Sequence, residues 1–267
     1  MNNLRGTLEA KRTKNRKILS IYLTAGYPDL QATVPLLKAI VDAGADLIEL
    51  GVPFSDPQAD GPVIQEASHK ALEAGTTVGA IFPILKEFRR YSSVPVILMG
   101  YANPFMKYGW QRIVKDAAEA GANGFIIPDL PPEESDEFAV LCHDAGLDLI
   151  FLVSPVTTPE RIEKINELTT GFIYAVSITG VTGVRQSLPP ATHAFLKRLR
   201  QQTSHPALVG FGVANAESAQ ILAEESDGVI IGSAIIRRIS EAESTQEACT
   251  SVGSFIREIR SALGENE

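Results

Sequence analysis

The chain has 267 residues, of which 45% are apolar, and this length is enough to bury one large hydrophobic core. Its formal net charge of -8 argues against a surface that binds nucleic acid, because neutralising phosphates requires clustered Lys and Arg. No apolar stretch approaches the roughly 20 residues of a membrane span, and the N-terminus lacks the apolar core of a signal peptide, so we expect a cytoplasmic protein.

The chain alternates between short β-rich runs and helical patterns. A basic run over residues 11–17 is expected to be a solvated helix end before the first strand. Most β-rich runs are almost continuously apolar, which is typical of strands buried on both faces of a parallel sheet. The predicted strands are Ile18–Leu23, Asp46–Leu50, Val94–Met99, Gly124–Ile127, Leu147–Val153, Phe172–Ser177, Ala207–Gly210 and Gly228–Ile231.

Helical patterns fill the intervals between these runs. Val34, Leu37 and Val41 lie at three- and four-residue spacing and therefore share one face of a helix. A similar apolar stripe over residues 252–263 predicts a helix at the end of the chain. Glycines follow the helical stretches where left-handed helix ends are expected, at Gly44, Gly75, Gly121, Gly146 and Gly171.

The order of the elements predicts an α/β protein with a closed barrel. Eight strands, each followed by a helical pattern, match a single (β/α)8 TIM barrel with additional N-terminal and C-terminal helices. An open doubly wound sheet is the main alternative, but it would usually have fewer strands, and no GxGxxG motif follows the first one. No linker or low-complexity tract divides the chain, so we expect one domain over residues 1–267.

The stretch 48–62, IELGVPFSDPQADGP, places carboxyl groups where the second predicted strand ends. In a barrel the active site lies at this end of the strands. Taken singly, Glu49 could pair with a neighbouring cation, and Asp60 followed by Gly61 could be an ordinary turn. Together they indicate a catalytic acid/base pair, because burial raises the pKa of a carboxyl group toward the range in which it both gives and takes a proton.

Glycine-bearing loops follow the last three predicted strands, with the sequences SITGVTGVRQS, GFGVANAES and IGSAIIRR. Any one glycine could simply form a tight turn. Three such loops on adjacent strands indicate a phosphate site, built from backbone N–H groups and the N-terminus of a helix. The absence of a GxxxxGK motif favours a phosphorylated metabolite over a nucleoside triphosphate. The candidate phosphate-binding residues are Gly183, Gly212, Gly232 and Ser233.

Metal and disulfide chemistry is not expected. Cys142 and Cys249 lie far apart in the sequence, with no CxxC pair and no His cluster nearby. The residues alone therefore predict an enzyme that moves protons on a small phosphorylated substrate.

Several motifs resemble the tryptophan synthase alpha subunit family in order and spacing. They are IELGVPFSDPQADGPVIQ, LMGYANPF, IIPDLPPEES, ITGVTG, GFGV and GSAII, within about residues 18–236. The resemblance implies a lyase of tryptophan biosynthesis, which cleaves indole-3-glycerol phosphate to indole and glyceraldehyde 3-phosphate by a retro-aldol reaction. It also implies no metal or organic cofactor in this subunit, and a pyridoxal-phosphate (PLP) β subunit as partner in an α2β2 complex.

The resemblance also implies roles for individual residues. Glu49 would move the protons, ionised Asp60 would accept the indole N–H bond, and Tyr174 would lie near the reacting chain, although a tyrosine there could equally fill the barrel. Thr182 resembles a residue that orders a lid over Asp60. The implied substrate-binding residues are Tyr22, where the family often has phenylalanine, Tyr101, Asp129, which could instead be a turn or helix-start residue, Thr182 and Phe211.

Three alternatives remain open from the sequence. A stand-alone indole-3-glycerol phosphate lyase would share the same residues, whereas a non-catalytic alpha subunit that only activates the β subunit is opposed by intact Glu49 and Asp60. A phosphosugar isomerase of the same fold would account for the phosphate loops but not for residues 48–62. The chain departs from the family at Gln58, where the family usually has an apolar residue and where a β subunit would dock.

Overall fold

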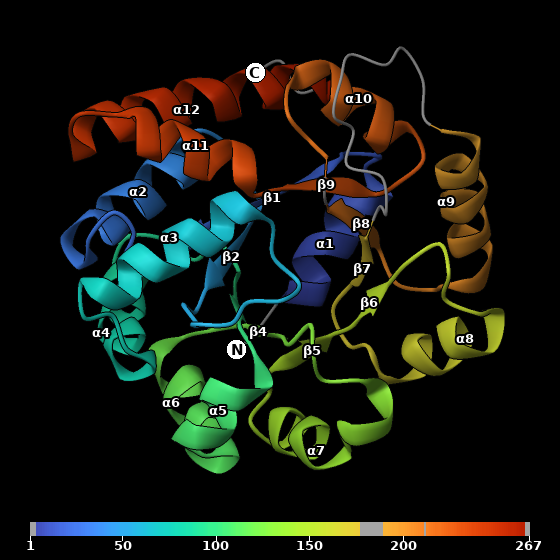
Figure 1. Cartoon of the computed structure of the whole chain (residues 1–267). Coiled ribbons are helices and arrows are strands. Elements are labelled where there is room, and N and C mark those ends of the chain that lie inside the picture. The colour runs from blue at the N-terminus through green and yellow to red at the C-terminus, as the bar shows by residue number, and fades with distance from the viewer. Residues whose placement is uncertain (1–3, 177–188, 211, 265–267) are drawn as a thin grey trace.

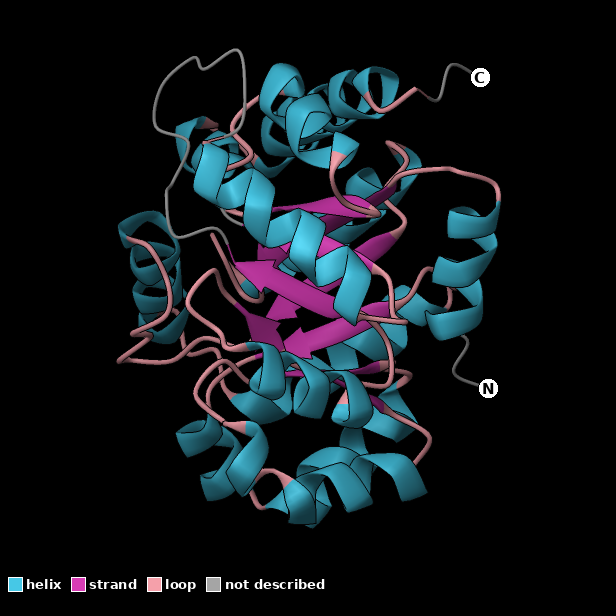
Figure 2. Cartoon of the chain, turned by 90° about the vertical axis from the view of Figure 1, so that its right-hand side faces the viewer, coloured by secondary structure: helices cyan, strands magenta, loops and turns pink. Residues whose placement is uncertain are grey.

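The computed structural model of the chain describes residues 4–176, 189–210 and 212–264. It contains a cylinder of strands surrounded by helices, and Figure 1 looks into one end of it. Figure 2 shows the same chain from the side, with the strands in the centre and the helices outside. The strands are β1 (Ile18–Thr24), β2 (Leu47–Gly51), β3 (Val96–Met99), β4 (Gly124–Ile126), β5 (Asp148–Ile150), β6 (Leu152–Val153), β7 (Ile173–Val176), β8 (Ala207–Gly210) and β9 (Gly228–Ile231).

The strands form one parallel sheet in the order β5-β4-β3-β2-β1-β9-β8-β7-β6. Only Phe151 separates β5 from β6, yet β5 pairs with β4 at one end of this order and β6 pairs with β7 at the other. The predicted fifth strand is therefore divided into two short strands that join the two ends of the sheet. This closure confirms the barrel and excludes the open doubly wound sheet.

Helices follow the strands as the sequence predicts, and α1 and α12 are the additional helices at the two ends of the chain. No helix in the described ranges combines the length and the apolar character that crossing a bilayer requires. A short 3-10 helix, η1 (Pro132–Glu134), precedes α7. The α-helices are α1 (Leu4–Thr13), α2 (Leu30–Asp42), α3 (Pro62–Glu73), α4 (Val78–Arg89), α5 (Ala102–Tyr108), α6 (Trp110–Ala120), α7 (Asp136–Asp144), α8 (Pro159–Leu168), α9 (Pro190–Gln202), α10 (Ala216–Glu224), α11 (Ser233–Glu241) and α12 (Thr245–Ala262).

Four of the five predicted left-handed glycines have a positive φ, namely Gly44, Gly75, Gly121 and Gly146. The prediction for Gly171 is wrong, because α8 ends earlier, at a C-cap residue, Thr169, with extended backbone. Gly171 serves packing instead. A Cβ at this position would lie 2.8 Å from Leu4 Cδ2, so the missing side chain lets α1 pack closely against the barrel.

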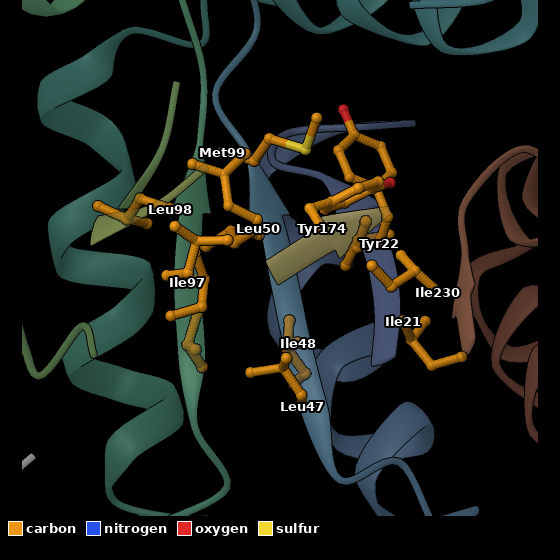
Figure 3. Close-up of a cluster of buried hydrophobic side chains, with 14 of the residues drawn as sticks. Ile21, Tyr22, Leu47, Ile48, Leu50, Ile97, Leu98, Met99, Tyr174 and Ile230 are labelled. Atoms are coloured by element: carbon orange, nitrogen blue, oxygen red, sulfur yellow. The ribbon is translucent and has the colours of Figure 1, made fainter. Parts of the chain in front are cut away.

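The strands are buried on both faces, as their continuous apolar runs predict. Every residue of β1 and β2 is buried. Figure 3 shows part of the resulting core, with Ile48 and Leu50 of β2 beside Ile97 and Leu98 of β3. One hydrophobic cluster includes residues of the strands and of the surrounding helices, as expected for a single domain. The single domain over residues 1–267 stays a prediction.

A buried carboxylate joins both terminal helices to the barrel. Asp46 lies immediately before β2, and its side chain is only 8% exposed. Its Oδ1 lies 2.5 Å from Nζ of Lys11 in α1, and its Oδ2 lies 2.7 Å from Nη1 of Arg260 in α12. The backbone N–H of Leu19 also donates to Oδ2, at 2.9 Å. The helices α1 and α12, from opposite ends of the sequence, are thus both attached to the barrel where β2 begins.

Candidate active site

A cavity of about 190 Å³ lies where several strands end at their carboxyl side. Such a position is where the loops of a (β/α)8 barrel assemble an active site. The loop after β2 contributes Asp60, and the loop between β9 and α11 contributes Gly232. The predicted site residues that line this cavity are Tyr22, Asp60, Tyr174, Gly212, Gly232 and Ser233. The structure therefore brings Asp60, the carboxyl group predicted to stay ionised, and three of the four predicted phosphate residues to one place.

Glu49 lies in the middle of β2, directly beside Tyr22 of β1 in the strand register. Its side chain is fully buried, and it is not itself among the residues that line the cavity. Ser20 Oγ donates to its Oε1 at 2.8 Å, whereas Oε2 has no hydrogen-bond partner in the described structure. Burial raises the pKa of Glu49 to about 8, so this carboxyl group is mostly protonated at neutral pH.

Asp60 lies in the loop between β2 and α3 and has a different environment. The Tyr101 hydroxyl donates to its Oδ2 at 2.9 Å, and the same hydroxyl accepts a hydrogen bond from the backbone N–H of Ala59 at 3.0 Å. Burial raises the pKa of Asp60 to about 6, and the Tyr101 bond partly opposes this by favouring the carboxylate. Asp60 is therefore mostly ionised at neutral pH. Two nearby carboxyl groups thus differ in protonation state.

Two tyrosines form a wall of the cavity, and Figure 3 shows the rings of Tyr22 and Tyr174 near Met99. Glycines make room for both rings. A Cβ on Gly51 would lie 2.2 Å from the Tyr22 hydroxyl, and a Cβ on Gly210 would lie 2.2 Å from the Tyr174 hydroxyl. Burial raises the pKa of both tyrosines, so their hydroxyl groups stay protonated and can donate hydrogen bonds.

The N-terminus of α11 faces the cavity through Gly232 and Ser233. Gly232 is the N-cap residue of this helix, and no side chain caps it. The first N–H groups of a helix have no acceptor within the helix, and the helix dipole adds partial positive charge there. This end of the helix, together with Gly212 in the neighbouring loop, is therefore suited to bind a phosphate group.

The comparisons with known proteins agree with this geometry. The family model described as "Tryptophan synthase alpha chain" matches residues 8–263. The chain is 44% identical to the tryptophan synthase alpha chain of Geotalea daltonii, over 95% of this chain and 96% of the relative. It is 41% identical to that of Geobacter sulfurreducens, over 99% and 100%. The chain belongs to the tryptophan synthase alpha chain family.

A solved structure supports the same membership. The tryptophan synthase subunit alpha of Legionella pneumophila superposes with a TM-score of 0.91 at 39% identity, and the match covers 98% of each chain. The match therefore extends over nearly the whole length of both chains.

Six predicted residues are not among those that line the cavity: Glu49 and Tyr101, which lie behind or beside it as described above, Asp129, and three residues outside the described ranges. Asp129 is not among the lining residues; its Oδ1 instead accepts from the backbone N–H of Ala102 at 2.9 Å, which ties the loop after β4 to the start of α5. Its contact with substrate stays a prediction. Thr182, Gly183 and Phe211 lie outside the described residues.

Sequence reasoning missed several contributors to this alpha chain site. Ser20, which holds one oxygen of Glu49, carries no motif signal, because only the strand register brings it beside β2. Met99 and Arg237 also line the cavity. A usable signal for Arg237 was present, since it stands four residues after Ser233 and therefore lies on the same face of α11.

Proposed function

We propose that this cavity performs the reaction of the tryptophan synthase alpha chain, the cleavage of indole-3-glycerol phosphate to indole and glyceraldehyde 3-phosphate. One observation supports this proposal above the others. Burial raises the pKa of Glu49, in the middle of β2, to about 8, and the pKa of Asp60, in the loop after this strand, to about 6. One group can therefore give a proton while the other stays charged, as a retro-aldol reaction on an indole requires.

Glu49 is proposed as the group that moves the protons. In its neutral form it can protonate carbon 3 of the indole, which converts the ring to an electron-accepting iminium form. The hydroxyl on the adjacent carbon of the side chain then loses its proton, the bond between that carbon and carbon 3 breaks, and its electron pair restores the indole ring. The hydroxyl carbon becomes the aldehyde of glyceraldehyde 3-phosphate. Glu49, ionised after the first step, is available to accept the hydroxyl proton.

Asp60 is proposed to stabilise the charge that develops on the ring. As a carboxylate it would accept the indole N–H bond and lie close to the positive charge that protonation of carbon 3 creates. Tyr101 holds this carboxylate by its hydrogen bond to Oδ2. Tyr22 and Tyr174 would then lie against the substrate from β1 and β7.

The phosphate group would bind at the N-terminus of α11. Gly212, Gly232 and Ser233 supply backbone N–H groups there, and Ser233 adds a hydroxyl. Gly183 is proposed for the same subsite from the sequence. None of these proton transfers or contacts requires a metal or organic cofactor from this subunit.

The alpha chain is proposed to act with a tryptophan synthase β subunit, which would hold the pyridoxal phosphate, in an α2β2 complex in the cytoplasm. Gln58, the residue that departs from the family, lies exposed in the loop after β2. Its amide is therefore solvated in the free subunit, and docking would cost binding energy only if the amide were buried without a hydrogen bond.

The test measures indole release from indole-3-glycerol phosphate by purified protein, with and without a β subunit. Glu49→Gln should lose at least about a hundredfold in turnover, because an acid/base group is removed without a change of shape. Asp56→Asn is the matched control in the absence of the β subunit, since Asp56 is an exposed carboxylate of the same loop; it should keep the wild-type rate. A near-normal rate in Glu49→Gln would reject the assignment.

The same assay separates the alternative functions. High turnover that a β subunit does not increase would indicate a stand-alone lyase. Absence of indole release under both conditions would indicate a subunit that only activates its partner. Failure to co-elute with the β subunit and to be activated by it would reject the proposed complex.

A further inference from the structure

We propose that Arg237 is a substrate-binding residue of this site, and that its guanidinium contacts the phosphate group held at the N-terminus of α11. This inference rests on the proposed function for the identity of the substrate. It adds a side-chain cation to a subsite that the sequence predicted from backbone groups alone.

Arg237 is placed correctly for such a contact. It lines the cavity together with Gly232 and Ser233, although its position is well inside α11 rather than in the loop. Residues four apart in an α-helix lie one turn apart on the same face, so Arg237 follows Ser233 along the helix surface that faces the cavity. An arginine side chain is long enough to reach back over one turn.

The guanidinium of Arg237 is not used elsewhere in the described structure. None of its nitrogens forms a hydrogen bond or ion pair with a described residue, and the side chain is exposed. The adjacent Arg238 differs in both respects. Its Nη1 donates to the backbone oxygen of Ala234 at 3.1 Å, and its guanidinium lies 3.6 Å from the centre of the Phe255 ring. Arg238 thus holds α11 against α12, whereas no described residue occupies the Arg237 guanidinium, which can therefore bind a ligand.

The charges around the cavity fit a substrate with two different ends. Among the described residues that line it, Asp60 and Arg237 carry the only formal charges, and no ion pair joins them. Asp60 suits an N–H donor, and Arg237 suits an anion. The chain has a formal net charge of -8, which repels a phosphate dianion at long range. The positive charge of a guanidinium inside the cavity counters this repulsion. A guanidinium also binds a phosphate group with two parallel hydrogen bonds.

The test compares Arg237→Ala, Arg237→Lys and Arg257→Ala in steady-state cleavage of indole-3-glycerol phosphate. We expect Arg237→Ala to raise KM about tenfold with kcat within about twofold, because a phosphate contact is the same in the bound substrate and in the transition state. Arg237→Lys should give an intermediate KM, since lysine keeps the charge but not the two-pronged geometry. Arg257 is an exposed arginine of α12 outside the cavity, so Arg257→Ala controls for the loss of one charge.

Binding of sn-glycerol 3-phosphate, measured by titration calorimetry, gives a second readout that needs no catalysis. Arg237→Ala should weaken it by a similar factor, and Arg257→Ala should not. Equal KM values and equal affinities in the two alanine variants would overturn the role of Arg237 while an active wild type left the proposed function standing. If the wild type releases no indole, but Arg237→Ala binds glycerol phosphate more weakly than the wild type and Arg257→Ala do, the proposed function is refuted and the phosphate contact is kept.

Discussion

Glu49 and Asp60 are the same kind of acid, and their surroundings give them different properties. Glu49 is fully buried, with one oxygen bound by Ser20 and the other without a hydrogen-bond partner among the described residues, so its charged form is strongly disfavoured. Asp60 is half-buried in a loop and receives a hydrogen bond from Tyr101, which offsets part of the cost of its charge. The difference in protonation therefore follows from position in the barrel.

This difference predicts the pH dependence of kcat/KM. Asp60 must be ionised, so activity should be lost as the pH falls through about 6. Glu49 must be protonated at the start of the reaction, so activity should be lost as the pH rises through about 8. Initial rates between about pH 5 and pH 9 should therefore give a bell-shaped profile with its maximum near neutrality.

Variants assign the two limbs of this profile. Asp60→Asn should remove the acidic limb from whatever activity remains, whereas Asp56→Asn in the same loop should leave both limbs in place. A wild-type profile that is flat across the whole range would contradict the assignment of both carboxyl groups.

The residue types of the site were predictable where one short stretch of sequence carries them. Glu49 and Asp60 lie in one motif, and Gly232 and Ser233 are adjacent, so local sequence identifies them. Ser20 and Gly51 were not predictable in this way. Ser20 matters because its strand pairs with β2, and Gly51 matters because the Tyr22 ring lies against it. Such contacts depend on register between strands, which no local pattern specifies.

At the scale of elements, the alternation of apolar runs and amphipathic patterns predicted every barrel strand to within a few residues. The division of the fifth strand at Phe151 was not predicted, because residues 149–153 form an unbroken apolar run. This division arises from the closure of the barrel, since the segment must pair with β4 on one side and with β7 on the other. Similarly, Gly171 follows a helix, but tertiary packing against Leu4 decides its role.

The attachment of the terminal helices can be tested at Asp46. Asp46→Asn should leave Lys11 and Arg260 beside a neutral side chain, and the free energy of unfolding should fall by about 3 kcal/mol, as expected when one partner of a buried ion pair is removed. Urea unfolding followed by circular dichroism measures this change. Turnover should be unaffected while the protein is folded, because Asp46 lies at the opposite end of β2 from the cavity.

A surface pair supplies the control for that measurement. Glu66 and Lys70 form an exposed ion pair on α3, so Glu66→Gln should change the urea midpoint very little. A comparable loss in both variants would mean that Asp46 contributes no more than an ordinary surface charge.

For the whole molecule, the two ends of the barrel have separate tasks. The proposed chemistry uses side chains where the strands end, and the attachment of α1 and α12 uses a carboxylate where a strand begins. The fully buried strands between them carry Tyr22 and Glu49 in adjacent register. Changes that stabilise the helix attachments therefore need not alter the site.

The short strands β5 and β6 make one side of the cylinder weaker than the other. They join β4 and β7 through three and two register positions, no more than β3 with β4 or β8 with β9, and they are also among the shortest strands, whereas β1 and β2 share five positions. Local opening of the barrel should therefore begin at β5 and β6. Native-state hydrogen exchange should show faster exchange for the amides of Ile150 and Val153 than for those of Ile21 and Leu50. Glu49, the acid proposed to start the reaction, would thus lie in the half of the cylinder that opens least often. It would be shielded from bulk water between turnovers.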